Sequence, residues 1–434
     1  MRLMTVRQLD SRVLRYASTG TSKSAFEWSS VEKAASRMVD TSVSAVASST
    51  QRGRNKPSDS VRFTFHASEF KTHNLEGTAR VPTTTNATAA ELLRYYEQMW
   101  TIRRMELVAD ALYKAKMIRG FCHLQTGQEA VPVGIEAALG PNDALITAYR
   151  CHGYALMRGA SVRSVLAELM GRGTGTSKGK GGSMHMYAKN FYGGNGIVGA
   201  QVPLGTGIAF AQKYENADAD KEGTKEREAA VTFALYGDGA ANQGQVFEVY
   251  NIAALLRLPV VFVCENNFYS MGTSTERSAF SARFYTRGDY IAGIQVNGMD
   301  VLAVREASRF AHAWCQAGKG PLLLEMVTYR YGGHSMSDPG TTYRLREEIQ
   351  AVRTKRDALK LLQHQILEAG FASESVLKEI EETVKAQVEA EMETAKADPM
   401  PDPSAFYEDV YAASGPVPLL RGCEYDHIHR FTHS

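Results

Sequence analysis

The chain has few cysteines, lacks a long apolar run and carries almost no net charge, and each shortage excludes a class of protein. Its five cysteines among 434 residues are widely spaced and form no CxxC pair, which argues against a disulfide scaffold or a zinc site and for a reducing compartment. No apolar run approaches the roughly 18–20 residues that a membrane span needs. A formal net charge of +2 gives no electrostatic case for nucleic-acid binding. The composition, 44% hydrophobic and 22% charged, is that of an ordinary globular protein.

The N-terminal segment differs in composition from the rest. Arginine and lysine far outnumber acidic residues there, serine, threonine and alanine are abundant, and apolar residues between Leu3 and Leu14 fall on one side of a helix. This composition is typical of an organelle transit peptide rather than a secretory signal, and a solvated tail is the alternative. We therefore expect a transit peptide and poorly ordered extension at 1–58, an N-terminal arm at 59–88, and one α/β domain with C-terminal helices at 89–434.

Apolar periodicity predicts most secondary structure in the remaining chain. We expect helices at 89–118, 159–172, 206–215, 301–318, 345–370 and 373–397, and a strand at 321–328. The glycine-rich, aromatic segment 177–202 shows neither a helical nor a strand period, which indicates a functional loop. The charged run 216–228 predicts a solvated surface insertion.

Two predicted strand ends carry the most informative residues. The apolar runs Val231–Tyr236 and Val260–Cys264 predict buried strands, and Gln243–Leu258 between them has helical spacing. A crossover of this length makes the two strands parallel and adjacent. Asp238 and Asn267 then emerge at the same carboxyl edge of one sheet, where open α/β folds bind ligands.

The groups at this edge suit a metal-bound phosphate ligand. One carboxylate, one amide oxygen and a nearby backbone carbonyl are ligands that Mg²⁺ prefers, and Mg²⁺ so held usually shares its shell with phosphates. Gly237 and Gly239 let the backbone approach a diphosphate, and the following helix points its positive end toward it. An ordinary Asp–Gly turn and Asn–Asn loop are the alternative for either residue alone.

The motif GDG, followed roughly thirty residues later by NN, resembles the signature of thiamine diphosphate enzymes. Further segments resemble the alpha subunits of the pyruvate dehydrogenase component of 2-oxo acid dehydrogenase complexes: GFCHLQTGQEA (120–130), LITAYRCHG (145–153), the loop 178–205 and YRYGGHSMSDPG (329–340). The resemblance extends from about Ala89 to near the C-terminus. It implies a thiamine diphosphate-binding α/β fold, a mostly parallel sheet flanked by helices, with extra N- and C-terminal helices.

The resemblance also implies an activity and a set of site residues. The reaction is the thiamine diphosphate-dependent oxidative decarboxylation of pyruvate, an oxidoreductase reaction that passes the acetyl group to lipoyl groups and feeds acetyl-CoA synthesis. Asp238 and Asn267 would bind Mg²⁺ through their side chains, and Tyr269 through its carbonyl. His123 and His334 are the catalytic candidates, because imidazole titrates near working pH. The cofactor contacts would be Tyr149, Arg150, Ala188, Gly196, Val198, Asp238, Gly239, Ala240, Asn267, Tyr269 and His334.

The same resemblance implies partners and regulation. A beta subunit in an α2β2 assembly would supply the other half of the cofactor site, the lipoyl domains of a dihydrolipoamide acetyltransferase core would accept the acetyl group, and the address would be the mitochondrial matrix. Ser335, Ser274 and Thr342 match positions that a kinase and a phosphatase control in animal relatives. An added phosphate beside a site for an anionic substrate would repel it. Three residues depart from the usual pattern: Gly332 replaces His, Phe268 replaces Arg and Ser270 replaces Gly.

Three other functions remain open at this stage. The alpha subunit of a branched-chain 2-oxo acid dehydrogenase differs only in its substrate. A nicotinamide-dependent dehydrogenase could use the formal GxGxxG at Gly194–Gly199, although no convincing strand–helix–strand frame surrounds it. A regulatory alpha-like subunit without catalysis is the non-enzyme alternative, which the presence of the whole ligand set disfavours.

Overall fold

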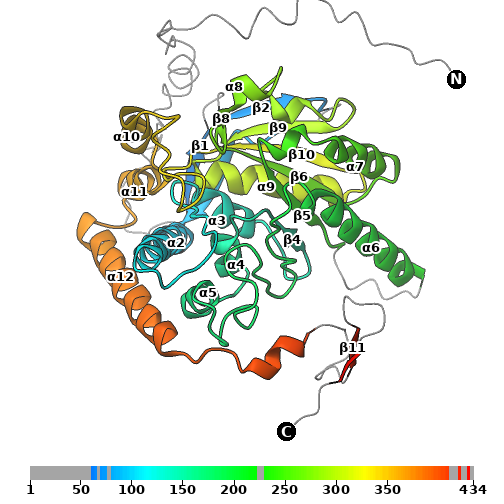
Figure 1. Ribbon diagram of the computed structural model, residues 1–434. Coiled ribbons are helices and arrows are strands. Elements are labelled where there is room, and N and C mark those ends of the chain that lie inside the picture. The colour runs from blue at the N-terminus through cyan, green and yellow to red at the C-terminus, as the bar shows by residue number, and fades with distance from the viewer. Residues whose placement is uncertain are drawn as a thin grey trace, which may run out of the picture. The chain divides into compact units, whose positions relative to one another are not determined.

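A six-stranded sheet forms the centre of the fold, with the strand order β2-β9-β10-β6-β5-β4 (Figure 1). Five strands are parallel: β4 (Ala144–Ile146), β5 (Thr232–Gly237), β6 (Val260–Asn266), β9 (Ala292–Asn297) and β10 (Leu322–Val327). The edge strand β2 (Phe70–His73) pairs antiparallel with β9. The expected α/β class with a mostly parallel sheet is confirmed.

The structure is a computed structural model that describes residues 60–65, 69–75, 80–221, 229–409, 419–421 and 428–430. All of them belong to one unit, Val43–Ser434. The predicted transit peptide at 1–58 and residues 222–228 of the predicted insertion lie outside the described residues. The predicted N-terminal arm contributes β2 to the central sheet and also pairs β1 (Ser60–Thr64) antiparallel with β3 (Thr84–Thr88).

The connection from β5 to β6 follows the predicted path. The short turn η2 (Ala240–Asn242) and helix α7 (Gly244–Leu255) join the two strands, and Gly237 lies opposite Glu265 in parallel register. Both strands are buried because helices cover both faces of the sheet, so their sequences are continuous apolar runs. The predicted adjacency of the two strand ends is confirmed.

Helices flank the central sheet, and further helices come after its last strand in the sequence (Figure 1). Their bounds are α2 (Ala89–Lys114), α3 (Ala130–Glu136), α4 (His152–Met157), α5 (Val162–Leu169), α6 (Gln201–Lys221), α8 (Thr275–Ser278), α9 (Val301–Gln316), α10 (Arg346–Lys355), α11 (Ala358–Glu368) and α12 (Glu374–Ala397). The remaining short elements are β7 (Tyr269–Ser270), β8 (Thr273–Ser274), η3 (Phe284–Thr286), η4 (Pro403–Tyr407), β11 (Leu419–Arg421) and β12 (Ile428–Arg430). Helix α12 packs against α2 and α5. Among the described helices, none is both long and apolar enough to cross a membrane.

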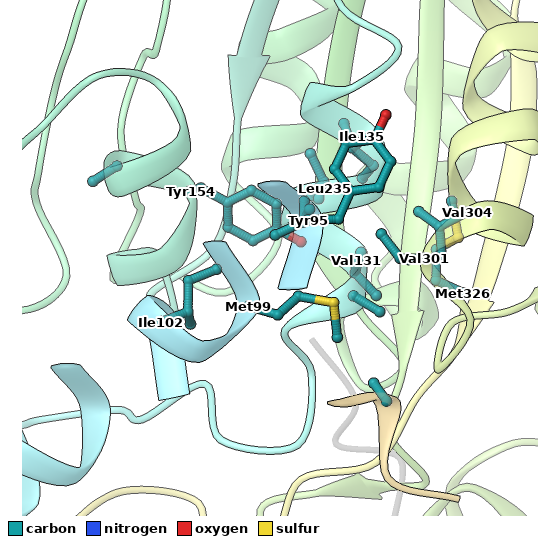
Figure 2. Packing of buried hydrophobic residues seen from close by; sticks show 14 of the residues in the cluster. Tyr95, Met99, Ile102, Val131, Ile135, Tyr154, Leu235, Val301, Val304 and Met326 are labelled. Atoms are coloured by element: carbon teal, nitrogen blue, oxygen red, sulfur yellow. The ribbon is translucent and has the colours of Figure 1, made fainter. Parts of the chain in front are cut away.

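Two hydrophobic cores lie on opposite faces of the sheet, because successive residues of a strand point to opposite sides. Leu235 packs in the larger core with side chains of α2, α3 and α9, among them Met99, Val131 and Val304 (Figure 2). Its neighbour Tyr236 packs in the second core with side chains of α6 and α7. The loops that follow the carboxyl ends of the strands are therefore anchored from both sides.

Several predicted helix boundaries are wrong. The single helix expected at 345–370 is two helices, α10 and α11, because Asp357 accepts hydrogen bonds from the backbone N–H groups of Leu359 and Lys360 and starts a new helix. The helix expected at 206–215 is α6, which begins at Gln201 inside the predicted loop and continues into the predicted insertion. The first long helix ends at Lys114 rather than at 118, and Lys116 adopts a positive φ of 61°.

Candidate active site

A pocket of about 620 Å³ opens beside segments that follow the carboxyl ends of β4, β6 and β10. It is lined by Phe121, His123, Tyr149, Met184, Gly196, Val198, Met271, Gly272, His334, Ser335, Ser337, Asp338, Pro339, Thr342 and Tyr343. The structure thus brings together five of the residues expected at the cofactor or in catalysis, from segments distant in sequence. These are His123, Tyr149, Gly196, Val198 and His334.

Three aromatic rings meet in this pocket. The ring of Tyr149 lies 4.5 Å from that of His123 and 5.3 Å from that of His334, centroid to centroid, and the two imidazoles lie 5.2 Å apart at an interplanar angle of 85°. The Nδ1 atoms of both histidines are buried and have no hydrogen-bond partner among the described residues. Each imidazole therefore has one ring nitrogen whose hydrogen-bonding capacity is not used by the described residues.

Arg150 lies close to these rings and, with burial, influences their charge state. Its guanidinium donates to the carbonyl of Leu124 and, at 2.9 Å, to the carbonyl of His334. Burial, together with the positive charge of Arg150, lowers the pKa of His123 to about 2 and that of His334 to about 4. Both imidazoles are therefore neutral near pH 7. The side chain of Arg150 is itself buried.

Two further arginines, which the sequence analysis missed, complete a buried basic cluster. Arg330 donates to the carbonyls of Tyr269 (3.1 Å) and Met271 (3.2 Å), and Arg344 donates to the carbonyl of Arg330 (2.6 Å). The arginines 150, 330 and 344 are 7%, 1% and 3% exposed, and none forms an ion pair with a carboxylate of the described residues. Burying unpaired charge is costly unless a counter-ion is present. The cluster is therefore suited to an anionic ligand.

The predicted metal ligands lie at the ends of β5 and β6. Asp238 is 2% exposed, and its Oδ2 has no hydrogen-bond partner among the described residues. Burial raises its pKa to about 6. The amide nitrogen of Asn267 donates to Gln128 at 3.1 Å, so its oxygen keeps only a long 3.4 Å contact from the backbone N–H of Tyr269. The carbonyl of Tyr269 accepts from Arg330 and retains a second lone pair.

These groups fit a hard cation, since a buried carboxylate oxygen without a partner calls for a positive ligand. No group of three or more His, Cys, Asp or Glu side chains that could hold a metal occurs in the described part of the chain. A cation here would therefore need amide, backbone and ligand oxygens in addition to Asp238. The turn that carries them is strained: Phe268 and Met271 adopt positive φ values of 69° and 54°. Such strain clusters at ligand sites.

The two glycines of the turn after β5 have different surroundings. Nothing lies within 4 Å of the position that a Cβ on Gly237 would occupy, so open space adjoins the backbone there. A Cβ on Gly239 would meet Ser270 Oγ at 1.9 Å, so packing alone requires that glycine. Ala240, which begins η2, is buried. Ala188 pairs with Phe191 in an isolated bridge, packs against the larger core and does not line the pocket.

The predicted regulatory residues occupy different environments. Ser335 is 8% exposed, lines the pocket and shares a 2.9 Å hydrogen bond with the hydroxyl of Ser337. Thr342 lines the pocket from an exposed position. Ser274 is half-buried at the start of α8 and does not itself line the pocket, although Gly272, two residues before it, does. Asp338 organises the loop of Ser335 by accepting from the backbone N–H groups of His334 (2.6 Å) and Gly340 (2.8 Å).

The GxGxxG at Gly194–Gly199 lacks the frame of a dinucleotide site. Residues 188–200 form turns and isolated bridges, and no strand precedes the motif in this segment. A Cβ on Gly194 would meet the carbonyl oxygen of Met184 at 2.4 Å and the sulfur of Cys151 at 2.7 Å. Close packing therefore explains that glycine without a nicotinamide cofactor.

Comparisons with known proteins agree with this geometry. The family model of the dehydrogenase E1 component matches residues 97–404. The chain is 54% identical over 367 residues to the mitochondrial pyruvate dehydrogenase E1 component subunit alpha of Saccharomyces cerevisiae (84% of each chain). It is 56% identical over 353 residues to the somatic, mitochondrial form from Homo sapiens (81% of this chain, 87% of that one). It is 57% identical over 345 residues to the mitochondrial protein of Schizosaccharomyces pombe (79% and 82%). The chain belongs to the dehydrogenase E1 component family.

Proposed function

We propose that the chain is the alpha subunit of a pyruvate dehydrogenase E1 component, which decarboxylates pyruvate oxidatively and transfers the acetyl group to lipoyl groups. Membership of the family and the names of its relatives support this proposal. The observation that carries it is that buried groups of opposite charge lack partners at the same, carboxyl edge of the sheet. Buried guanidinium groups lack carboxylate partners, and the buried Asp238 lacks a partner for Oδ2. A metal diphosphate would satisfy both.

Thiamine diphosphate is the cofactor that the family implies, and when bound it supplies the group that takes up the electron pair released with CO₂. Arg150 and Arg330 would offset the charge of the diphosphate. Asp238, Asn267 and the carbonyl of Tyr269 would hold Mg²⁺ against it. The backbone of Gly239 and Ala240 would border the same phosphates, and Tyr149, Gly196 and Val198 would line the cofactor space, with Ala188 behind it.

His123 and His334 handle protons at the mouth of this space. Each neutral imidazole carries one proton and one free lone pair, so it can donate a hydrogen bond to an anionic substrate or accept a proton from a reacting group. Negative charge brought beside Arg150 would raise the pKa of His334 toward its ordinary range, because it offsets the guanidinium that lowers it. Such charge would offset the contribution of Arg150 to that pKa, whereas the larger contribution of burial would remain.

A partner chain would complete the site. Phe121, Val198 and Met271 line the pocket and are 63%, 45% and 60% exposed, so its outer wall is apolar and is not covered by the part of the chain that the structure describes. We propose a beta subunit in an α2β2 assembly as the cover, lipoyl domains of a dihydrolipoamide acetyltransferase core as acetyl acceptors, and the mitochondrial matrix as the location.

Regulation by a kinase and a phosphatase is part of the same proposal. A phosphate on Ser335 would place roughly two negative charges inside the pocket, where the hydroxyl now contacts Ser337. Phosphorylation of Thr342 or Ser274 would act from the rim or from the start of α8, with less direct interference. Ser335 is therefore expected to be the position with the strongest effect.

The proposal is tested by 2-oxo acid decarboxylation with thiamine diphosphate and Mg²⁺, by the chain alone and co-expressed with its candidate beta partner. Pyruvate is compared with a branched-chain 2-oxo acid. CO₂ release from pyruvate that requires the partner supports the proposal and its divided active site. Preference for the branched-chain 2-oxo acid would support the same reaction with a different substrate. An assembled, cofactor-bound enzyme without activity would overturn the catalytic proposal.

A further inference from the structure

A second buried carboxylate organises the glycine-rich loop that precedes the pocket wall. Glu168, in the last turn of α5, is 0% exposed. Its Oε1 accepts hydrogen bonds from the backbone N–H groups of Gly181 (2.7 Å) and Gly182 (2.9 Å). Its Oε2 accepts from those of Ser177 (2.8 Å) and Gly179 (2.9 Å). One side chain therefore fixes four backbone groups of a single loop.

Backbone dipoles alone compensate this charge. Glu168 forms no ion pair with a basic side chain of the described residues, so its buried charge depends on the four N–H donors. The glycines permit the wrapping: a Cβ on Gly175 would meet Glu168 Oε2 at 2.3 Å, and Gly182 adopts a φ of 65°. The contacts with this internal carboxylate therefore account for glycines of the sequence GTGTSKGKGG (173–182).

The loop leads directly into the wall of the candidate active site. Ser183, which follows Gly182, accepts a hydrogen bond from the backbone N–H of His123 at 3.3 Å. Its hydroxyl also lies 2.9 Å from Nε2 of His152, whose Nδ1 lies 3.0 Å from the carboxylate of Glu106. The next residue, Met184, lines the pocket. The path from Glu168 to the backbone of His123 thus runs through one short, hydrogen-bonded segment.

Contacts on the outer side of the loop are weaker supports. Lys178 and Lys180 reach Asp409 at 3.0 and 2.9 Å, but Lys178 and Asp409 are more than half exposed. Exposed ion pairs of this kind contribute little to stability, because solvent screens the two charges. Hydrogen bonds to a buried charged group each contribute more. The interior carboxylate therefore dominates the conformation of the loop.

We propose that Glu168 is a positioning residue of the active site, which sets the backbone path of 177–182 and thereby places Ser183, Met184 and the backbone of His123 around the cofactor space. Glu168 does not itself line the pocket. The consequence for cofactor affinity rests on the proposed function, whereas the conformation of the loop does not.

The test uses Glu168→Gln in the enzyme co-expressed with its beta partner. Glutamine keeps the shape of the side chain but turns an NH₂ group toward two of the four backbone donors. We expect amide exchange in 177–182 to accelerate at least about tenfold, the KM for thiamine diphosphate to rise about tenfold, and kcat at saturating cofactor to change less than about twofold. Glu381→Gln is the matched control. Among the described residues, Glu381 accepts a hydrogen bond only from the hydroxyl of Tyr96, at the contact between α2 and α12.

Glu168→Asp is a milder second variant if Glu168→Gln fails to assemble. It keeps the carboxylate but withdraws it by one methylene from the four backbone N–H groups, and we expect the same two changes at smaller size. Unchanged amide exchange would overturn the role of Glu168 in the loop. Faster exchange with unchanged KM would overturn its link to the active site. Thiamine diphosphate affinity measured by calorimetry separates these outcomes from failure of the proposed reaction, since it requires no turnover.

Discussion

Two glycine-rich segments of this chain each bury one carboxylate, but only one of them supplies hydrogen-bond donors to both carboxylate oxygens. In the loop after α5, Glu168 receives four backbone N–H groups. In the turn after β5, Asp238 is equally buried, yet its Oδ2 has no partner among the described residues. A buried polar atom without a partner costs free energy unless a ligand supplies one. Glu168 is therefore suited to a structural role, whereas Asp238 is suited to binding a cation.

The largest expected effect is on the unsatisfied member of this pair. Asp238→Asn removes the charge that would bind Mg²⁺, and loss of such a metal ligand costs several kcal/mol, so we expect pyruvate decarboxylation to fall at least about a thousandfold. The measurement is activity against Mg²⁺ concentration in the assembled enzyme.

Asp143→Asn is the matched control for that prediction. Asp143 is also buried, but it precedes β4 at the opposite sheet edge and already accepts from the backbone N–H groups of Gly140 (2.6 Å) and Val231 (2.8 Å). Its replacement should lower stability and leave the Mg²⁺ dependence of activity unchanged. An Asp238→Asn enzyme with the Mg²⁺ dependence of the wild type would refute the metal assignment.

Stability should respond to the two carboxylates with opposite sign. Glu168→Gln breaks charged hydrogen bonds in the interior, and we expect it to lower the free energy of unfolding by about 2–4 kcal/mol. Asp238→Asn relieves an uncompensated buried charge, so in the absence of Mg²⁺ and cofactor it should leave that free energy unchanged or raise it by about 1–2 kcal/mol. Denaturant unfolding of both variants at one pH measures this difference. Equal decreases in the free energy of unfolding would contradict the prediction.

Sequence patterns were sufficient to predict the part of the site that rests on local order. Continuous apolar runs predicted β5 and β6, and parallel pairing then brought Asp238 and Asn267 to one edge. The family resemblance added the His123, Tyr149 and His334 cluster, which the structure assembles from three loops. Their roles toward a cofactor stay predictions.

Contacts between distant segments were beyond prediction. Gln128 holds the amide of Asn267 across a separation of 139 residues, and Arg330 reaches the carbonyl of Tyr269 across 61, and no local pattern announces either pair. The break at Asp357 was missed for a related reason. Its capping hydrogen bonds are local, but a 3.1 Å ion pair with Arg103 of α2 also holds it.

A smaller effect is expected on the pH dependence of stability. Burial, with the charge of Arg150, lowers the pKa of His334 to about 4, below its usual value near 6.5 in the unfolded chain. The stability associated with the neutral ring is therefore present above pH 6.5 and is lost as pH falls toward 4, because protons bind the unfolded chain more tightly. We expect His334→Asn to lose less stability than the wild type between pH 7 and pH 5, measured by denaturant unfolding.

The cause of that shift can be tested separately. Arg150→Gln removes the nearest positive charge, so the pKa of His334 should rise, as measured by NMR titration of labelled imidazole. Arg163→Gln is the control, since Arg163 pairs with Asp398 on the outer side of α5. A titration curve of His334 that is identical in the Arg150 variant and the wild type would show that Arg150 does not contribute to the low pKa of His334.

The smallest effect is expected where a carboxylate is hydrogen-bonded but not fully buried. Glu91 accepts from the backbone N–H of Thr88 at 2.9 Å in the capping box of α2, and its side chain is 28% exposed. Glutamine can still complete a capping box, and solvent screens the contact with Arg305 (3.4 Å). Glu91→Gln should therefore lower the free energy of unfolding by about 0.5 kcal/mol, far less than Glu168→Gln, when both are measured by denaturant unfolding. Equal losses would contradict the view that burial of the charge determines what such a carboxylate contributes.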